Sequence, residues 1–261
     1  MAIGNQNYWD YRGGVSYRYK NETFYTITPI PYYHRRRALL LELLKPLIEC
    51  HAVKDVCDFG CGDGWYIQHF GQQYPDKRYW GVDISSSMIE RARLAAPFAE
   101  FQVSQAGFDF TNAFDLVYSV AVFAHIQDKM LSTIFQNIRM TLRKGCKFAL
   151  FEQTGPVRRE GETWIRRTPR EYTEFASNCG FDIEISCLIT FPAHRFFEKY
   201  IAPMFYRWFA GGKEHHERCI CANRSKIFRI LSTMFLNMSR NPIRRPDCMK
   251  EGNALFILKR A

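Results

Sequence analysis

From residue 54 onward, short apolar or β-branched runs alternate with stretches that have apolar residues at helical spacing. The short runs are typical of buried strands, and the longer stretches are typical of amphipathic helices. The predicted strands cover 54–59, 78–83, 100–105, 114–123, 146–153, 181–191 and 253–259. This order predicts an α/β fold with a doubly wound, mostly parallel seven-stranded sheet and helices on both of its faces.

The helices are expected between these runs. They are predicted at 34–50, 64–73, 86–96, 129–143 and 168–180. The helix over 86–96 is expected to have a serine cap at Ser85 or Ser86. The helix over 129–143 is expected to end at the basic pair Arg143 and Lys144, just before Gly145.

The alternation stops at residue 192 and returns at 253, which divides the chain into four parts. Residues 1–35, rich in tyrosine and arginine, are expected to form a lid, and 36–191 a ligand-binding core. Residues 192–252 are expected to form a helical insertion before 253–261, which completes the core. The stripe from Ile227 to Met238 leaves three interpretations open: core contacts, a lid over a partly apolar acceptor, or a surface that lies against a membrane.

The net charge of +10 is concentrated toward the C-terminus. Residues 153–261 carry 19 Lys and Arg against 11 Asp and Glu, whereas residues 1–152 carry 17 against 15. This imbalance fits an ordinary solvated basic surface. It also fits a surface that meets an anionic substrate, a membrane or nucleic acid.

Nine cysteines are scattered along a chain that begins without a basic and apolar leader, so we expect reduced thiols and a cytoplasmic location. No run approaches the length of a membrane span. The cluster HHERCIC at 215–221 does not have the spacing of a common structural zinc site, and no metal is predicted.

The stretch VCDFGCGDGWY at 56–66 places Gly60, Gly62 and Gly64 between a predicted strand and a predicted helix. Such a turn brings backbone N–H groups close to a ligand at a positively polarised helix start. We expect that a side chain at Gly60 would fill the space the ligand needs. Asp58 suits an ammonium group, and Asp83, at the end of the next strand, suits two ribose hydroxyls. An amino acid joined to a nucleoside indicates S-adenosylmethionine.

With these residues the chain resembles the class I S-adenosylmethionine-dependent methyltransferases over roughly 50–190 and the last strand. The fourth-strand and fifth-strand motifs, FDLVYSVAVFAHI and LRKGCKFALFEQ, agree with that family. The resemblance implies an adenine site formed by Ile84, with Met88 behind it, and by Gln105 and Ala106. Gln105 stands where the family often has an acidic residue. Cys61, Ser119 and Val120 are implied as further cofactor contacts, with Tyr118 beside them.

Methyl transfer from a sulfonium is an in-line displacement, so the enzyme holds a nucleophile about 3 Å from the methyl carbon and removes its proton. His125, in the loop after the fourth strand, is the candidate base, and simple packing under the loop is its alternative. Glu152, at the end of the fifth strand, is expected to orient the acceptor or to cap a turn.

The sequence lacks Asn/Asp-Pro-Pro-Tyr and the paired glutamates of arginine methylation. This favours methylation of oxygen or nitrogen on a small-molecule acceptor: a sugar-containing, lipid-linked or other secondary metabolite, with an anionic group as an option. A nucleic-acid partner is not expected, and a peripheral membrane contact stays open. The alternatives are an RNA methyltransferase that uses the basic C-terminal half, and a binding protein that keeps the fold without transferring methyl.

Overall fold

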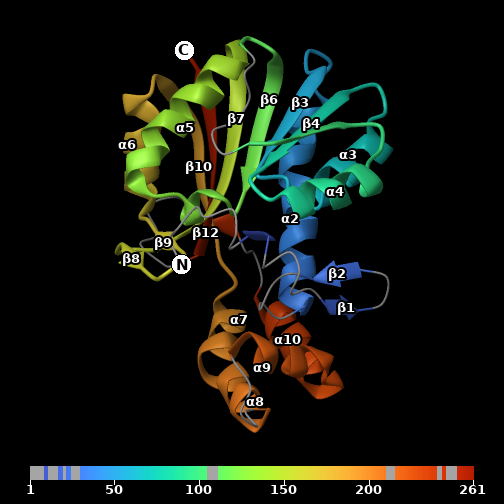
Figure 1. Cartoon of the computed structure of the whole chain (residues 1–261). Coiled ribbons are helices and arrows are strands. Elements are labelled where there is room, and N and C mark those ends of the chain that lie inside the picture. Colours follow the sequence, from blue (N-terminus) through green and yellow to red (C-terminus); the bar gives the residue numbers. More distant parts are fainter. Residues whose placement is uncertain are drawn as a thin grey trace. The chain divides into compact units, whose positions relative to one another are not determined.

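The chain folds into two compact units (Figure 1). A computed structural model describes residues 9–10, 17–19, 22–24, 30–104, 111–209, 215–239, 243–244 and 252–261. The first unit takes its described residues from 1–14, 44–189 and 244–261, and the second takes them from 15–43 and 190–243. Helix α2 (Ile30–Glu49) contributes residues to both units, and it begins four residues before the predicted start at His34.

A parallel sheet with one reversed strand forms the centre of the first unit. Its spatial order is β10 (Phe181–Ile189), β12 (Gly252–Arg260), β7 (Leu142–Thr154), β6 (Phe114–Val120), β3 (Asp55–Phe59), β4 (Arg78–Asp83) and β5 (Glu100–Val103). The two-residue strand β11 (Ile243–Arg244) extends the sheet beyond β10. Strands β3 to β7 pair in parallel, whereas β12 runs antiparallel to both of its neighbours. The predicted mostly parallel sheet of seven strands is confirmed.

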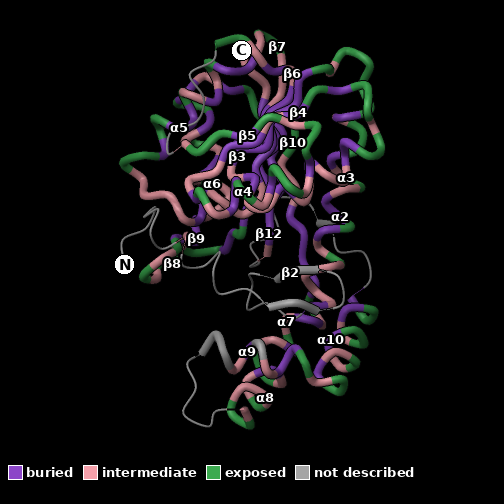
Figure 2. The backbone as a smooth tube through the Cα atoms, turned by 45° about the vertical axis from the view of Figure 1, so that its right-hand side comes forward, coloured by how far each residue is buried: buried purple, intermediate pink, exposed green. Residues whose placement is uncertain are grey.

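Helices cover the two faces of this sheet, and β6 shows how one strand serves both layers. The helices of the first unit are α3 (Trp65–Gln73), α4 (Ser86–Ala95), α5 (Asp128–Thr141) and α6 (Pro169–Asn178). Val117 belongs to a buried cluster with residues of α5 and α6. The next residue, Tyr118, faces the opposite way and has its ring centroid 6.0 Å from that of Phe70 in α3. Strands buried on both faces explain why the apolar runs in the sequence were nearly continuous (Figure 2).

The boundary between α5 and β7 corrects one prediction. Arg143 and Lys144 are not the end of the helix, because α5 ends at Thr141 and β7 begins at Leu142. Arg143 instead donates from Nη1 to Asp115 at 2.5 Å and from Nη2 to Asp55 at 2.9 Å. Basic residues are common in the last turn of a helix, but Arg143 instead belongs to a tertiary ion-pair network.

The second unit is mainly helical. It contains the hairpin β1 (Tyr17–Tyr19) and β2 (Glu22–Phe24), the N-terminal part of α2, α7 (Pro192–Phe196), the π-helix η2 (Phe197–Ile201), α8 (Ala202–Trp208), α9 (His215–Arg224) and α10 (Lys226–Met238). Phe197, Ala202, Ala222 and Phe228 form its buried centre. Residues 15–43 thus group with the insertion, whereas the sequence placed the boundary of the N-terminal segment at residue 35. None of the described helices is both long enough and apolar enough to cross a membrane.

Candidate active site

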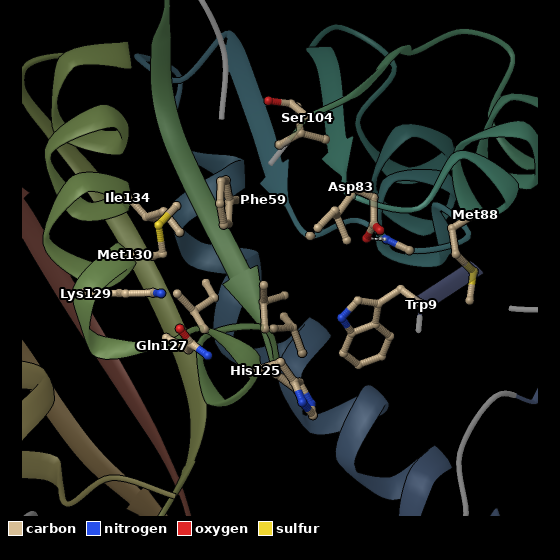
Figure 3. A pocket seen from close by; sticks show the side chains of 18 residues that line it. Trp9, Phe59, Asp83, Met88, Ser104, His125, Gln127, Lys129, Met130 and Ile134 are labelled. Carbon is tan, nitrogen blue, oxygen red and sulfur yellow. Dashed lines mark hydrogen bonds between the residues drawn. The ribbon is translucent and has the colours of Figure 1, made fainter. Parts of the chain in front are cut away.

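A cavity of about 480 Å³ lies at the edge of the first unit's sheet where β3, β4 and β6 end (Figure 3). Its wall is formed by Trp9, Phe59, Gly60, Gly62, Val82, Asp83, Ile84, Met88, Ser104, Val120, Ala121, Val122, His125, Ile126, Gln127, Lys129, Met130 and Ile134. Parallel strands bring their carboxyl ends to one edge, so segments far apart in the sequence meet here.

The predicted site residues fall into three groups. Gly60, Gly62, Asp83, Ile84, Met88, Val120 and His125 line the cavity. Asp58, Cys61, Ser119 and Glu152 are buried and do not line it. Gln105 and Ala106 lie outside the residues that the structure describes, as do the side chains of His215 and His216.

The glycines of the loop after β3 all have positive φ angles, 78° at Gly60, 54° at Gly62 and 75° at Gly64. The space around them differs. A Cβ atom on Gly60 would lie 2.2 Å from Cγ2 of Val122, whereas a Cβ atom on Gly62 would meet nothing within 4 Å. A side chain at Gly60 would therefore meet Val122 first, whereas Gly62 is the glycine beside open space.

Asp83 ties this loop to the end of β4. Its Oδ2 accepts from the N–H of Gly62 and its Oδ1 from the N–H of Ser85, both at 2.9 Å. Burial raises the pKa of Asp83, and these N–H donors oppose the rise. The carboxylate lies in the cavity wall, where it can still accept hydrogen bonds from a ligand.

Asp58 is buried below the loop, and its Oδ2 has no hydrogen-bond partner among the described residues. Burial raises the pKa of Asp58 well above its usual range, the hydroxyl of Tyr118 opposes the rise, and the negative charge of Asp83 adds to it. A buried carboxylate oxygen without a partner is costly, and a cationic ligand group would offset that cost. The open side of Gly62 and this orphaned oxygen, which is buried outside the cavity lining, are compatible with a ligand that carries an ammonium group.

Ser119 and Cys61 have structural contacts. The Ser119 hydroxyl donates to the carbonyl of Phe59 at 2.8 Å and so links β6 to β3. The Cys61 sulfur lies where a Cβ atom on Gly81 would approach it to 2.8 Å, so the thiol packs closely on β4. Burial raises the pKa of the Cys61 thiol well above its usual value, which keeps it a neutral packing group.

His125 ends the short 3₁₀-helix η1 (Phe123–His125) and reaches the cavity. Its Nδ1 lies 2.6 Å from the carbonyl oxygen of Thr163. Because a carbonyl can only accept, Nδ1 carries the proton and the neutral ring leaves Nε2 as an acceptor. The Trp9 ring meets the imidazole edge to face, with 4.7 Å between the centroids.

Glu152 holds the turn that carries His125. Its carboxylate accepts from the N–H groups of Val122 and Phe123 at 2.6 Å and of Ala124 at 3.3 Å. Burial raises the pKa of Glu152 from 4.5 to about 7, although these donors and the charge of Arg167 oppose the rise. The contacts are those of a residue that positions the turn.

Arg167 binds the carbonyl groups of the same turn. The sequence analysis did not identify Arg167 as a site residue. The guanidinium is fully buried. It donates to the carbonyl of Phe123 at 2.8 Å and to that of Ile126 at 2.6 Å, and it pairs with Asp128 at 2.5 Å. No local pattern distinguishes Arg167 from its neighbour Arg166, so only the fold reveals its role.

Trp9 lines the cavity, and its neighbour Asp10 binds the start of α4. The Asp10 carboxylate accepts from the Ser85 hydroxyl at 2.5 Å and from the Ser87 N–H at 3.4 Å. The aromatic composition of residues 1–35 was the sequence signal for a lid, but nothing in it indicated that Trp9 lines the cavity. Ala121, with φ of 58°, was also missed, since no sequence pattern marks a non-glycine residue in that conformation.

Comparisons with known proteins agree with this geometry. Residues 56–145 match the family model described as a methyltransferase domain. Trans-aconitate 2-methyltransferase from Enterobacter sp. (strain 638) is 38% identical over 79 residues, which cover 29% of this chain and 31% of that protein. The chain thus matches less than a third of that relative's length.

Two solved structures share the fold over most of the chain. The O-methyltransferase of a trans-AT PKS multienzyme from Brevibacillus brevis, in complex with S-adenosyl-L-homocysteine, aligns with a TM-score of 0.60 at 18% identity, covering 90% of this chain and 78% of that one. Coclaurine N-methyltransferase, bound to N-methylheliamine and S-adenosylhomocysteine, aligns with a TM-score of 0.60 at 15% identity, covering 87% and 71%. The sheet order and the glycine loop define a Rossmann-like methyltransferase fold. Residues 56–145 thus contain a methyltransferase domain, and the solved structures that share the fold include methyltransferases bound to S-adenosyl-L-homocysteine.

The two loop glycines should respond differently to alanine. Both substitutions place a side chain at positive φ, which costs roughly 1–2 kcal/mol. Gly60→Ala should lower the free energy of unfolding by about 1–3 kcal/mol more than Gly62→Ala, because its methyl group overlaps Val122. Gly62→Ala should instead weaken binding of S-adenosylhomocysteine, because its methyl group enters open space beside the cavity. Urea unfolding and calorimetric titration measure the two effects.

A second substitution serves as the control for that pair. Val122→Ala in the Gly60→Ala background should restore part of the lost stability, because it removes the overlapping methyl groups. Equal destabilisation by both glycine variants, with no recovery in the double variant, would contradict the assigned geometry.

Glu152 should make stability depend on pH. Between pH 4.5 and about 7 the native carboxyl keeps a proton that the unfolded chain has lost, so this group stabilises the native state as the pH falls through that window. The effect is at most about 1.4 kcal/mol per pH unit. In urea unfolding at several pH values, the difference in unfolding free energy between wild type and Glu152→Gln should grow as the pH is lowered. Parallel pH profiles would show that Glu152 titrates alike in both states.

Proposed function

We propose that the protein transfers the methyl group of S-adenosylmethionine to an oxygen or nitrogen atom of a small-molecule acceptor. The observation that carries this proposal is a cavity of about 480 Å³, which has Asp83 and Gly62 in one wall and His125 in another. A cavity of this size is in the range of small-molecule sites.

The residues at the ends of β3 and β4 would hold the cofactor. The Asp83 carboxylate would accept hydrogen bonds from the ribose hydroxyls, Ile84 and Met88 would contact the adenine, and the N–H groups near Gly62 would approach the amino-acid end. The orphaned Oδ2 of Asp58 supports a charge interaction with the ammonium group. Val120 would line the same pocket, while Cys61 and Ser119 would support it from the buried side. Gln105 and Ala106 are proposed adenine contacts on the resemblance alone.

The bound cofactor supplies an activated methyl group on a sulfonium. His125 would take the proton from the acceptor through Nε2, since Nδ1 donates to Thr163. Glu152 and Arg167 would keep the imidazole in place by fixing the turn, so Glu152 would position the base rather than contact the acceptor. Trp9 would restrict the rotation of the imidazole.

The acceptor would enter from the side of α5. Lys129 lines the cavity there, and Figure 3 shows its ammonium group directed toward the space. Gln127 adds an amide, whereas Ile126, Met130 and Ile134 are apolar. This lining favours an acceptor with an anionic group and an apolar body. A relative named for its action on trans-aconitate, a carboxylate anion, agrees with the anionic group.

Asp83→Asn tests the cofactor site. Loss of the negative charge should weaken binding of S-adenosylhomocysteine by about 1.5–3 kcal/mol, the usual worth of hydrogen bonds to a charged group. Isothermal titration calorimetry measures the change, and Asp182→Asn, on the exposed face of β10, provides a matched control. Unchanged affinity in Asp83→Asn would show that the ribose is bound elsewhere.

His125→Ala tests the base. Turnover, measured by release of S-adenosylhomocysteine with acceptor mixtures rich in carboxylates, phenols and amines, should fall by about 10²-fold. Cofactor affinity should be nearly unchanged, because the proton is removed at the acceptor.

His69→Ala, which removes a histidine of α3, is the control for that experiment. A stable His125→Ala protein with full turnover would rule out the base. A variant that loses activity only in proportion to its unfolded fraction would assign His125 to packing.

A further inference from the structure

The second unit holds almost all of the chain's net charge. Residues 15–43 and 190–243 contain 14 Lys and Arg against 5 Asp and Glu, a net charge of +9 out of +10 for the whole chain. The residues of the first unit are therefore nearly balanced, at +1. The charge follows the folded unit more closely than it follows the halves of the sequence.

An exposed apolar stripe runs along α7, η2 and α8 of this unit. Its members recur every four residues, which places them on one face. They are Phe196, Tyr200, Met204 and Trp208, each between 52% and 84% exposed. The other face of the same helices supplies Phe197 and Ala202 to the buried centre of the unit, so the stripe is not needed to build the core.

Helix α10 carries a second exposed stripe. Ile227, Ile230, Met234 and Met238 are each between 49% and 65% exposed. One ring contact connects the two stripes. Phe196, of the first stripe, stacks on Phe235 of α10 with 6.0 Å between the ring centroids. Met238, of the second stripe, lies one helical turn beyond Phe235. Residues 233 and 237 of the same helix are exposed and polar, which makes α10 apolar on one exposed side only.

The cations around the stripes are placed to keep their charges in water. Lys199 extends over the exposed Tyr200 ring, with Nζ 4.9 Å from the ring centroid. Arg207 precedes Trp208 and Lys226 precedes Ile227, and both basic side chains are exposed. Glu198 is the one acidic residue in 192–208 and 226–238 together, and its Oε2 lies 3.8 Å from Nδ1 of buried His194. Long basic side chains with apolar stems suit a boundary between an apolar layer and anionic groups.

We infer that the two stripes form a docking surface for an anionic phospholipid bilayer, with the aromatic and aliphatic side chains at the acyl boundary and the lysines and arginines at the lipid phosphates. Amphipathic helices that carry Trp and Phe on one face and basic residues beside it bind membranes in this way. The aliphatic residues decide between partners. RNA would stack on Phe196, Tyr200 and Trp208 but gains little from Ile227, Ile230, Met204, Met234 and Met238, whereas acyl chains would bury them all.

Vesicle co-sedimentation of the full chain tests this inference, with no cofactor or acceptor present. The result is therefore independent of methyl transfer. The protein should bind vesicles of phosphatidylcholine mixed with phosphatidylglycerol at least about tenfold more strongly than vesicles of phosphatidylcholine alone, and high salt should weaken that binding. The double variant Ile230→Asp, Met234→Asp should lose about tenfold or more of the binding.

The matched control is Thr233→Asp, Asn237→Asp, which makes the same charge change on the polar side of α10. It should lose clearly less binding, and circular dichroism melts establish that both variants fold. Equal losses in the two variants would reduce the effect to net charge and overturn the inference, as would the absence of vesicle binding. Stripe-dependent binding of single-stranded RNA in place of vesicles, or stripe-dependent dimers in sedimentation, would also overturn it.

Discussion

Two buried side chains of opposite charge, Glu152 and Arg167, hold the turn on which the site depends. The Glu152 carboxylate accepts hydrogen bonds from the N–H groups of residues 122–124. The Arg167 guanidinium donates hydrogen bonds to the carbonyl groups of Phe123 and Ile126. A buried turn needs partners for its backbone groups, and charged side chains make stronger hydrogen bonds than neutral ones. Removing one member of such an arrangement leaves the other charge without compensation. Because Val122 packs on Gly60 and His125 ends the turn, this arrangement fixes the glycine loop and the proposed base together.

Carboxyl groups at the two ends of the parallel strands have pKa values that are shifted in opposite directions. At the cavity end, Asp58 and Asp83 have raised pKa values, since burial outweighs the donors around them. At the far end, Asp115 is also penalised by burial, but the N–H groups of Asp55 and Lys54 and the cation of Arg143 lower its pKa overall. Asp115 thus has its counter-charge within the protein, whereas Asp83 lines the cavity with capacity left for a ligand.

The division into two units separates two kinds of surface. The first unit is nearly neutral and contains the cavity, while the second is strongly basic and has exposed apolar residues on α8 and α10. Exposed aromatic and aliphatic groups cost solubility unless they serve a contact. Their occurrence with the basic residues of one unit supports separate roles: a reaction site in one unit and an attachment surface in the other.

The sequence by itself determined the strands of a mostly parallel sheet and placed Gly60, Gly62, Asp83 and His125 at the ends of those strands, because strand periodicity and a glycine loop after an acidic residue are local patterns. It did not determine what each residue does there. The reason Gly60 must be glycine is Val122, from a loop about 60 residues away, and Glu152 is enclosed by backbone N–H groups from another strand's end. Arg143 and Arg167 have the same local context as surface arginines. Only tertiary structure could decide these roles, since the distances and burial that set clashes, hydrogen bonds and pKa values arise between segments that the sequence keeps far apart.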